Sequence, residues 1–170
     1  MDVDALQVRI YPDPVLKQIA TPVSAIDEGV RALAGRMIDL MYAADGIGLA
    51  APQVGVSKRL FVTRDPDDAV RALVWINPVL DVIDEGMASD SEGCLSLPDI
   101  DVNVQRPTGI RIRGVDLDGR EMVMESCEHI ARVWQHECDH LDGRLIIDRM
   151  STMDRLRCRR AIRALVERGG

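Results

Sequence analysis

Apolar and polar residues between positions 21 and 46 recur with the period of an amphipathic helix. Thr21-Pro22-Val23-Ser24 has the composition of a helix start, and Asp45-Gly46 has that of a helix stop. Residues 10–14 hold two prolines and are expected to be extended. We therefore predict an N-terminal helix after an extended lead, with a buried face formed by Ile26, Val30, Leu33, Ala34, Met37, Ile38 and Met41.

The middle of the chain has the composition and the alternation of β-strands. Asp118-Gly119 separates two alternating segments, which predicts a β-hairpin. Pro78 is expected to close a strand, and the acidic segment 65–68 is expected to form a loop. The predicted strands are residues 59–63, 74–77, 79–83, 110–115 and 121–124.

Helical spacing returns in the last third of the chain. One helix is expected to begin near Ser126 and to end at Asp142-Gly143. Ser151-Thr152-Met153-Asp154 is a capping signature that opens a last helix. Two interpretations fit the arginines of this helix: a solvated face attracted to an acidic body, or a binding surface. The arginines are Arg155, Arg157, Arg159, Arg160, Arg163 and Arg168.

The composition fits one globular domain, residues 1–170, with a core built from aliphatic side chains. Of the 170 residues, 46% are hydrophobic and 29% are charged. A net charge of −7 argues against general nucleic-acid binding, so we expect no DNA partner. The sequence has no bilayer-spanning apolar run and no basic, apolar leader, so we expect no membrane association and a cytoplasmic location.

The segment 135–143 contains the pattern His-Glu-x-x-His. Residues four apart lie on one face of a helix, so His136 and His140 would direct two imidazoles at one point, as a metal site requires. Glu137 would lie close enough to reach a water on the metal, which suits a general base. A catalytic site of this kind needs a third protein ligand.

The residues alone leave the third ligand open among the cysteines, because a thiolate is a good partner for two imidazoles. Cys94 and Cys127 lie upstream of the motif, Cys138 points off the histidine face, and Cys158 falls in a later helix. A buried structural role is the commoner fate of a lone cysteine. His129 shares the histidine stripe, either as a flanking residue or as an ordinary helix residue.

The segment 46–53, Gly-Ile-Gly-Leu-Ala-Ala-Pro-Gln, is small, apolar and bounded by glycines. Such a segment can run extended and permit close approach of another backbone. One interpretation is a buried structural strand. The other is a substrate-facing strand on which Gln53 offers an amide donor.

Three segments stand in order: Gly46–Gln53 as above, Glu92-Gly93-Cys94-Leu95-Ser96, and Gln135-His136-Glu137-Cys138-Asp139-His140. With the Tyr-Pro-Asp-Pro-Val-Leu start, they resemble the peptide deformylase family over nearly the whole chain. The resemblance implies an α+β fold, in which a mostly antiparallel sheet packs around a central metal-binding helix, with an N-terminal and a C-terminal helix. It also implies one divalent ion on Cys94, His136 and His140, natively Fe²⁺, with Zn²⁺ or Ni²⁺ as alternatives.

The activity implied by the resemblance is hydrolysis of the N-terminal formyl group of formylmethionine on nascent polypeptides, with release of formate. Glu137 would move the proton, and the Gln53 amide and the Leu95 N–H would hold the oxyanion. Glu92 is expected to pair with Arg106 behind the site. Substrate contacts are expected from Ile47, Gly48, Gly93, His129 and Val133.

Two departures from the family pattern concern the substrate. Residues 99–101 are Asp-Ile-Asp where an arginine is common, which makes the entrance more acidic, and His129 replaces a usual apolar residue. In bacterial relatives the C-terminal helix can dock on the ribosome, and the arginine-rich helix here suits polyanionic RNA by charge.

Two other functions remain for comparison. A thermolysin-like peptidase shares His-Glu-x-x-His but takes a downstream carboxylate as third ligand. Asp142 and Asp148 are too close for that, and Glu167 lies on the basic helix. A non-catalytic metal-binding or ribosome-associated protein would need neither Glu137 nor Gln53.

Overall fold

The structure, a computed structural model, describes residues 2–169 and has the predicted α+β architecture. Each strand of its five-stranded antiparallel sheet pairs with the next along the chain. The strands are β1 (Gly48–Ala50), β2 (Leu60–Asp65), β3 (Asp68–Cys94), β4 (Leu97–Val115) and β5 (Glu121–Ser126). The helices are α1 (Glu28–Ala43), α2 (His129–Leu141), α3 (Ile146–Arg149) and α4 (Thr152–Arg168), with 3₁₀ turns η1 (Pro14–Lys17) and η2 (Ala51–Val54).

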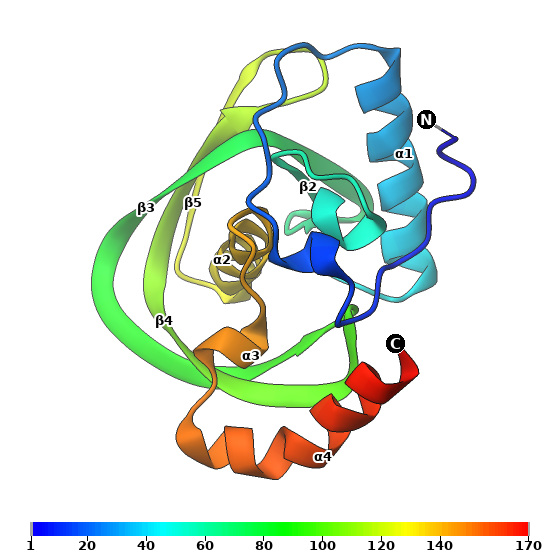
Figure 1. The fold of residues 1–170 in the computed structure, drawn as a ribbon. Helices are drawn as coiled ribbons and strands as arrows, with labels where there is room; N and C mark the ends of the chain where they lie inside the picture. The colour runs from blue at the N-terminus through cyan, green and yellow to red at the C-terminus, as the bar shows by residue number, and fades with distance from the viewer. Residues whose placement is uncertain (1, 170) are drawn as a thin grey trace.

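Helix α2 lies at the centre of the molecule, and the strands curve around it (Figure 1). Its buried side packs on the sheet through Trp134, whose ring contacts Trp75 edge-on at a centroid distance of 6.0 Å. A second apolar cluster joins α1 to β1 and β2 through residues such as Met37 and Leu60. The sheet therefore holds α2, and α1 packs in turn on β1 and β2, so that functional side chains on α2 have a rigid base.

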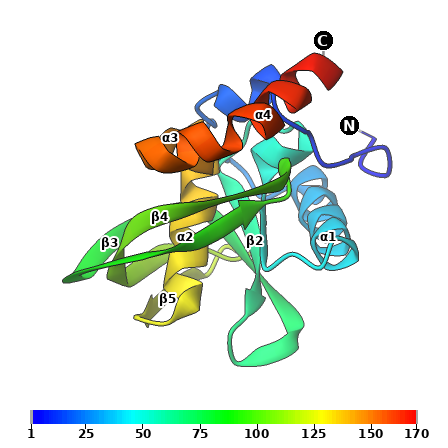
Figure 2. The same cartoon turned by 90° about the horizontal axis from the view of Figure 1, so that it is seen from below.

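The long hairpin of β3 and β4 dominates the sheet (Figure 2). The sequence predicted that Pro78 closes a strand, and this was wrong, because β3 continues through it. The pairing shifts between Ile76 and Val79, so the residue without an N–H lies at an irregularity where no ladder bond is lost. Cys94 ends β3, and residues 95–96 turn the chain into β4.

The predicted helices exist, but two begin later than expected. Helix α1 begins at Glu28 because the Asp27 side chain accepts a hydrogen bond from the Val30 N–H, whereas residues 21–24 are not helical. Helix α2 begins at His129, since Ser126 still belongs to β5. The start of α4 is as predicted, with Ser151 as its N-cap.

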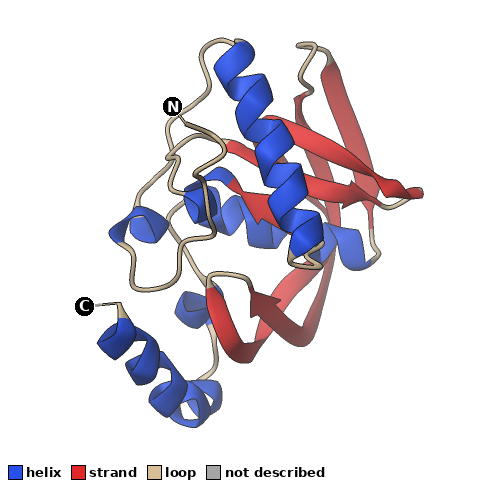
Figure 3. Cartoon of the chain, turned by 90° about the vertical axis from the view of Figure 1, so that its right-hand side faces the viewer, coloured by secondary structure: helices blue, strands red, loops and turns tan. Residues whose placement is uncertain are grey.

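Helices α3 and α4 pack on the N-terminal half of β4. Helix α4 lies at the opposite end of the molecule from the top of α1 (Figure 3). Cys158 and Leu165 are the residues of α4 that are buried in this apolar cluster. No helix within residues 2–169 is long and apolar enough to cross a membrane.

Candidate metal centre

The two motif histidines meet on one face of α2. His136 Nε2 and His140 Nε2 lie 3.2 Å apart, as their spacing of one helical turn predicts. The strand end of β3 brings a third donor to them, because Cys94 Sγ lies 3.4 Å from His140 Nε2. The three donor atoms all lie within 4.8 Å of one another.

These separations fit a single metal ion. A tetrahedral ion with bonds of about 2.3 Å to sulfur and about 2.05 Å to nitrogen keeps its ligand atoms about 3.3 to 3.6 Å apart. The other cysteines are excluded by position, since Cys127 is exposed and Cys138 packs in the core on the far side of α2. Cys158 lies in α4. The geometry therefore identifies Cys94 as the candidate for the third ligand, whereas the sequence alone left the choice among the cysteines open.

The electrostatics of the site also favour a bound cation. Burial, joined by the nearby His136, holds the pKa of His140 well below its usual value, so its imidazole is neutral as a metal ligand must be. Burial lowers the pKa of His136 too, but Cys94 and Glu92 outweigh it and raise this pKa well above the usual value. A positive charge is thus stabilised between Cys94 and Glu92.

Glu137 lies beside this group with a buried carboxylate. It is 3% exposed, and its Oε2 atom has no hydrogen-bond partner within residues 2–169. Burial raises the pKa of Glu137 to about 7, against the opposing effect of His136. A carboxyl group with this pKa can accept and release a proton near neutral pH.

Gln53 reaches the site from η2, not from the extended strand that the sequence suggested. Its Oε1 accepts a hydrogen bond from the Ala50 N–H at 2.9 Å, which fixes the orientation of the amide. Its Nε2 then lies 3.5 Å from Cys94 Sγ and 3.2 Å from Ser96 Oγ. The amide donor therefore points at the metal-ligand group. Leu95 occupies the turn between β3 and β4 that follows Cys94.

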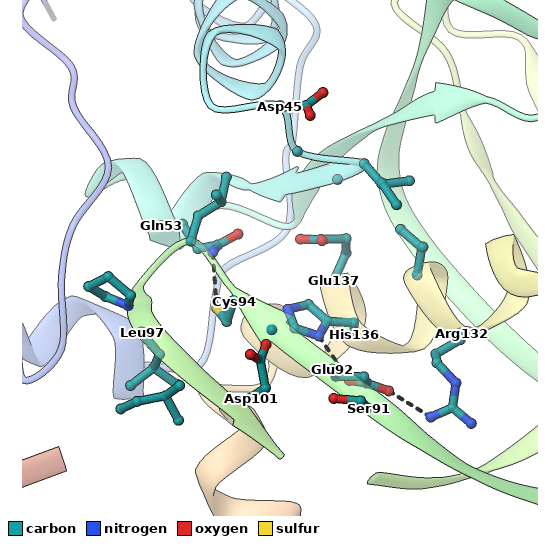
Figure 4. A pocket seen from close by; sticks show the side chains of 18 of the residues that line it. Asp45, Gln53, Ser91, Glu92, Cys94, Leu97, Asp101, Arg132, His136 and Glu137 are labelled. Atoms are coloured by element: carbon teal, nitrogen blue, oxygen red, sulfur yellow. Dashed lines mark hydrogen bonds and ion pairs between the residues drawn. The ribbon is translucent and has the colours of Figure 1, made fainter. Parts of the chain in front are cut away.

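A cleft of about 560 Å³ opens over the site (Figure 4). The two metal-ligand candidates nearest the surface, Cys94 and His136, line it, whereas His140 lies beneath them, 1% exposed. Every other residue expected to act on the substrate also lines it: Ile47, Gly48, Gln53, Gly93, Leu95, His129, Val133 and Glu137.

The geometry agrees with the comparisons to known proteins. The family model described as polypeptide deformylase matches residues 5–156. The chain belongs to the polypeptide deformylase family. A peptide deformylase from Alkalilimnicola ehrlichii is 44% identical over 166 residues, which cover 96% of this chain and 92% of the relative.

Solved structures of peptide deformylases have the same fold. A crystal structure from Legionella pneumophila matches with a TM-score of 0.87 at 35% identity and covers 95% of both chains. One from Thermotoga maritima matches with a TM-score of 0.81 at 42% identity and covers 86% of this chain and 97% of the other. The chain is accordingly a metallohydrolase with a single metal site.

In this deformylase-family chain, an ion-pair network supports the candidate metal ligands. Glu92 Oε2 accepts a hydrogen bond from His136 Nδ1 at 3.0 Å, which turns the other ring nitrogen toward Cys94 and His140. Arg106 binds both oxygens of Glu92, at 2.6 and 2.8 Å, as the sequence suggested. Although burial alone would raise it, these bonds hold the pKa of Glu92 well below its usual value.

The sequence did not point to the rest of this network. Arg132 donates to Glu92 at 2.8 Å, and Arg106 also binds Asp139 at 2.9 Å. Arg149 from α3 binds both oxygens of Asp139. Asp139 sits inside the His-Glu-x-x-His pattern, one turn beyond Gln135 and three residues after His136. This position within the motif was the one sequence feature that could have indicated its role.

Proposed function

We propose that the cleft removes the formyl group with Glu137 as the proton carrier beside one divalent metal ion. The observation that carries this proposal is the convergence of the Cys94, His136 and His140 donor atoms within 4.8 Å at the cleft that Glu137 lines. The reaction is that of the family: hydrolysis of the N-terminal formyl group of nascent polypeptides, which yields formate and a free amine.

The native ion that we propose is Fe²⁺, with Zn²⁺ and Ni²⁺ as substitutes. A set of one thiolate and two imidazoles accepts all three, so availability decides among them. When bound, such an ion supplies Lewis-acid chemistry, because it lowers the pKa of water and polarises a carbonyl. Element analysis of protein purified without oxygen, paired with formate assays after reloading with each ion, tests the choice.

Glu137 performs the proton transfers in this proposal. Its carboxylate takes a proton from the attacking water and delivers it to the leaving amine nitrogen. The pKa of about 7 supports this role, since a group that both accepts and donates works best near the ambient pH. The absence of a hydrogen-bond partner at Oε2 within residues 2–169 leaves the carboxylate free to exchange the proton.

Gln53 and Leu95 hold the oxyanion that forms on the formyl carbon. The Gln53 amide is preorganised by Ala50, so its N–H group needs no reorientation during the reaction. Leu95 follows Cys94 in the turn after β3, and its backbone N–H is the second donor. Both donors are uncharged and lie beside the ligand group, where a developing negative charge is stabilised.

The substrate peptide adds as a strand along β1. Within residues 2–169 this strand forms one edge of the sheet, pairs with β2 alone, and lines the cleft at Gly48. Gly93 lines the cleft from the end of β3, so backbone is available on both sides of an extended peptide. The methionine side chain lies against Ile47, His129 and Val133.

The whole chain acts as one catalytic domain in this proposal. Strand β4 contributes Ile110 and Ile112 to the cluster under α2, and Leu97 and Val102 to the cluster under α4. A single strand thus belongs to both clusters, which couples them in folding. We expect one cooperative unfolding transition, monitored by tryptophan fluorescence and circular dichroism.

We propose, in addition, that α4 binds the ribosome. Its six arginines are exposed, and four have no carboxylate within 4.0 Å among residues 2–169: Arg155, Arg159, Arg160 and Arg168. Replacing these four by glutamine should abolish salt-sensitive cosedimentation with ribosomes. The control replaces four exposed arginines elsewhere, Arg71, Arg113, Arg120 and Arg144. Equal loss in both variants would mean a general charge effect.

The decisive test of the reaction is formate release from a formyl-Met peptide by the Glu137→Ala variant. We expect turnover to fall by about 10²–10⁴-fold with one metal ion per chain retained. Unchanged deformylation would refute the mechanism. Cleavage of an internal amide by the wild type would favour a peptidase instead.

The ligand set is tested by cysteine variants. Cys94→Ala should lose the metal, because two imidazoles alone do not complete the site. Cys127→Ala is the matched control and should retain it, since that thiol is exposed and lies outside the donor group. Metal loss from Cys127→Ala instead would show that the wrong cysteine has been assigned.

A further inference from the structure

We propose that Gly48 is a positioning residue for the proton carrier: its missing side chain leaves the slot in which the Glu137 carboxylate lies. This proposal rests on the role proposed for Glu137. A Cβ atom added to Gly48 would lie 2.5 Å from Glu137 Oε1 and 2.9 Å from its Cγ and Cδ atoms. Optimal carbon contacts are about 3.5–4.0 Å, so any side chain at position 48 displaces the carboxylate.

Backbone conformation does not explain the glycine. The glycines with positive φ are Gly55, Gly119 and Gly143, and Gly48 is not among them. Gly48 lies in β1 and pairs with Thr63 of β2, in a conformation that alanine adopts easily. The obstacle to a side chain at this position is therefore the Glu137 carboxylate.

The carboxylate depends on this packing for its position. Its Oε2 atom is buried without a hydrogen-bond partner in residues 2–169, so no bond at that atom holds it in place. Its Cα is fixed by α2, which is packed on the sheet, and its carboxylate reaches toward β1 (Figure 4). The helix and the bare Gly48 backbone thus define where the proton carrier stands relative to Cys94 and His136.

A contact of this kind predicts a loss in turnover without a loss in binding. We expect Gly48→Ala to lower kcat on a formyl-Met peptide by about 100-fold, the effect of a displacement of about 1 Å at a reacting centre. KM should change less than about threefold, and metal content should stay at one ion per chain. If Gly48 served only to pair with the substrate backbone, KM would rise at unchanged kcat, which would overturn the proposal.

A stability cycle tests the contact without any assay of activity. Gly48→Ala should lower the urea midpoint of the wild type but should cause no further decrease in the Glu137→Ala background, where the obstructing atoms are gone. An equal decrease in both backgrounds would overturn the proposal. If Gly48→Ala does not fold, a folded double variant supports the contact, and an unfolded one refutes it.

A glycine outside the site provides the control. Gly35→Ala in α1 meets nothing within 4 Å and should leave kcat, KM and folding unimpaired.

The outcomes separate this proposal from the proposed function. If Glu137→Ala retains full formate release, the proton-carrying role fails and the positioning role fails with it, whatever the stability cycle shows. If Glu137→Ala is inactive but Gly48→Ala retains its kcat, the function stands and the Gly48 proposal alone is refuted.

Discussion

Buried carboxylates on the two sides of α2 lie in opposite environments: one lacks a partner at one oxygen, and the others are bound by arginines. On the cleft side, Glu137 is buried with no partner for Oε2 within residues 2–169. On the side of the β3–β4 hairpin, Glu92 and Asp139 are equally buried but are bound by arginines. The pKa values move apart accordingly: that of Glu137 is raised to about 7, and that of Glu92 is held well below its usual value.

This contrast distinguishes a carboxylate that can move a proton from carboxylates that hold structure. A compensated carboxylate stays ionised and orients His136 by accepting its Nδ1 hydrogen bond. An uncompensated one titrates near neutral pH and can carry a proton. The environment of each carboxylate therefore distinguishes them, although all three residues are acidic and lie on or beside α2.

The largest effect on stability is expected when Arg106 is removed. This arginine, 3% exposed, binds both Glu92 and Asp139, so Arg106→Met leaves two buried carboxylates with less compensation. Breaking a buried ion pair on one side costs about 3–5 kcal/mol, so we expect a loss of that size in the free energy of unfolding, measured with urea.

The control for that loss is an exposed arginine on the same strand. Arg111 pairs with Glu125 in a setting where both side chains are more than 40% exposed. Arg111→Met should change stability by less than about 1 kcal/mol. Equal effects of the two variants would mean that the buried network is not a special source of stability.

The next effect is on metal affinity. Glu92→Gln keeps the shape of the side chain but replaces one oxygen by an NH₂ group and leaves Arg106 and Arg132 facing a neutral amide. Loss of the group that orients a ligating histidine typically lowers metal affinity by about 10–100-fold. Competition with a chromogenic chelator measures this. Glu125→Gln should leave the affinity unchanged.

The fold shows what hydrophobic periodicity can and cannot predict. The helical spacing of residues 26–41, the hairpin around Asp118-Gly119 and the capping signature at Ser151 all predicted real elements, because one face of each is buried. Residues 84–109 gave no strand prediction. Most side chains of residues 84–91 are exposed and polar, so their extended state comes from pairing across the β3–β4 hairpin and not from local pattern.

The residues of the site also divide into those that the sequence predicts and those that it does not. His136 and His140 follow from helical spacing alone, since one turn brings them together, and Glu137 follows from its place next to His136 in the motif. Cys94 is 42 residues upstream of His136, and only the resemblance or the structure can place it. Arg132 and Asp139 are ordinary charged helix residues in sequence. Their partners are set by how β3, β4 and α3 pack on α2, which local reasoning cannot reach.

A smaller effect is expected at the outer end of the network. Arg149 is 34% exposed, and Asp139 keeps its bond to Arg106 when Arg149 is replaced by methionine. Charged hydrogen bonds near the surface are weakened by water, so Arg149→Met should cost about 1 kcal/mol of unfolding free energy. In the Arg106→Met background the cost should be larger, since Asp139 then has neither arginine; strict additivity would contradict the shared role of Asp139.

The smallest effect on stability is expected at Asp154 in α4. This residue tests whether hydrogen bonds to a buried carboxylate lower its pKa and stabilise the fold outside the network around Glu92. Asp154 accepts hydrogen bonds from the Asn103 N–H, the Ser151 hydroxyl and Arg157. Against the opposing effect of burial, these bonds lower the pKa of Asp154. Because the folded pKa lies below the unfolded value of about 3.9, its contribution to stability is present above that pH and is lost as the pH falls through the folded pKa.

Asp154→Asn should therefore lower the urea midpoint at pH 7, and the gap to the wild type should narrow below about pH 4. Metal affinity should not change, because no bond links Asp154 to Glu92 or His136 within residues 2–169. A gap that stayed constant from pH 7 to pH 3 would mean that the side chain acts only through its shape. In that case ionisation of a compensated carboxylate would matter at Glu92 because of the ligand it orients, and not as a general feature of this fold.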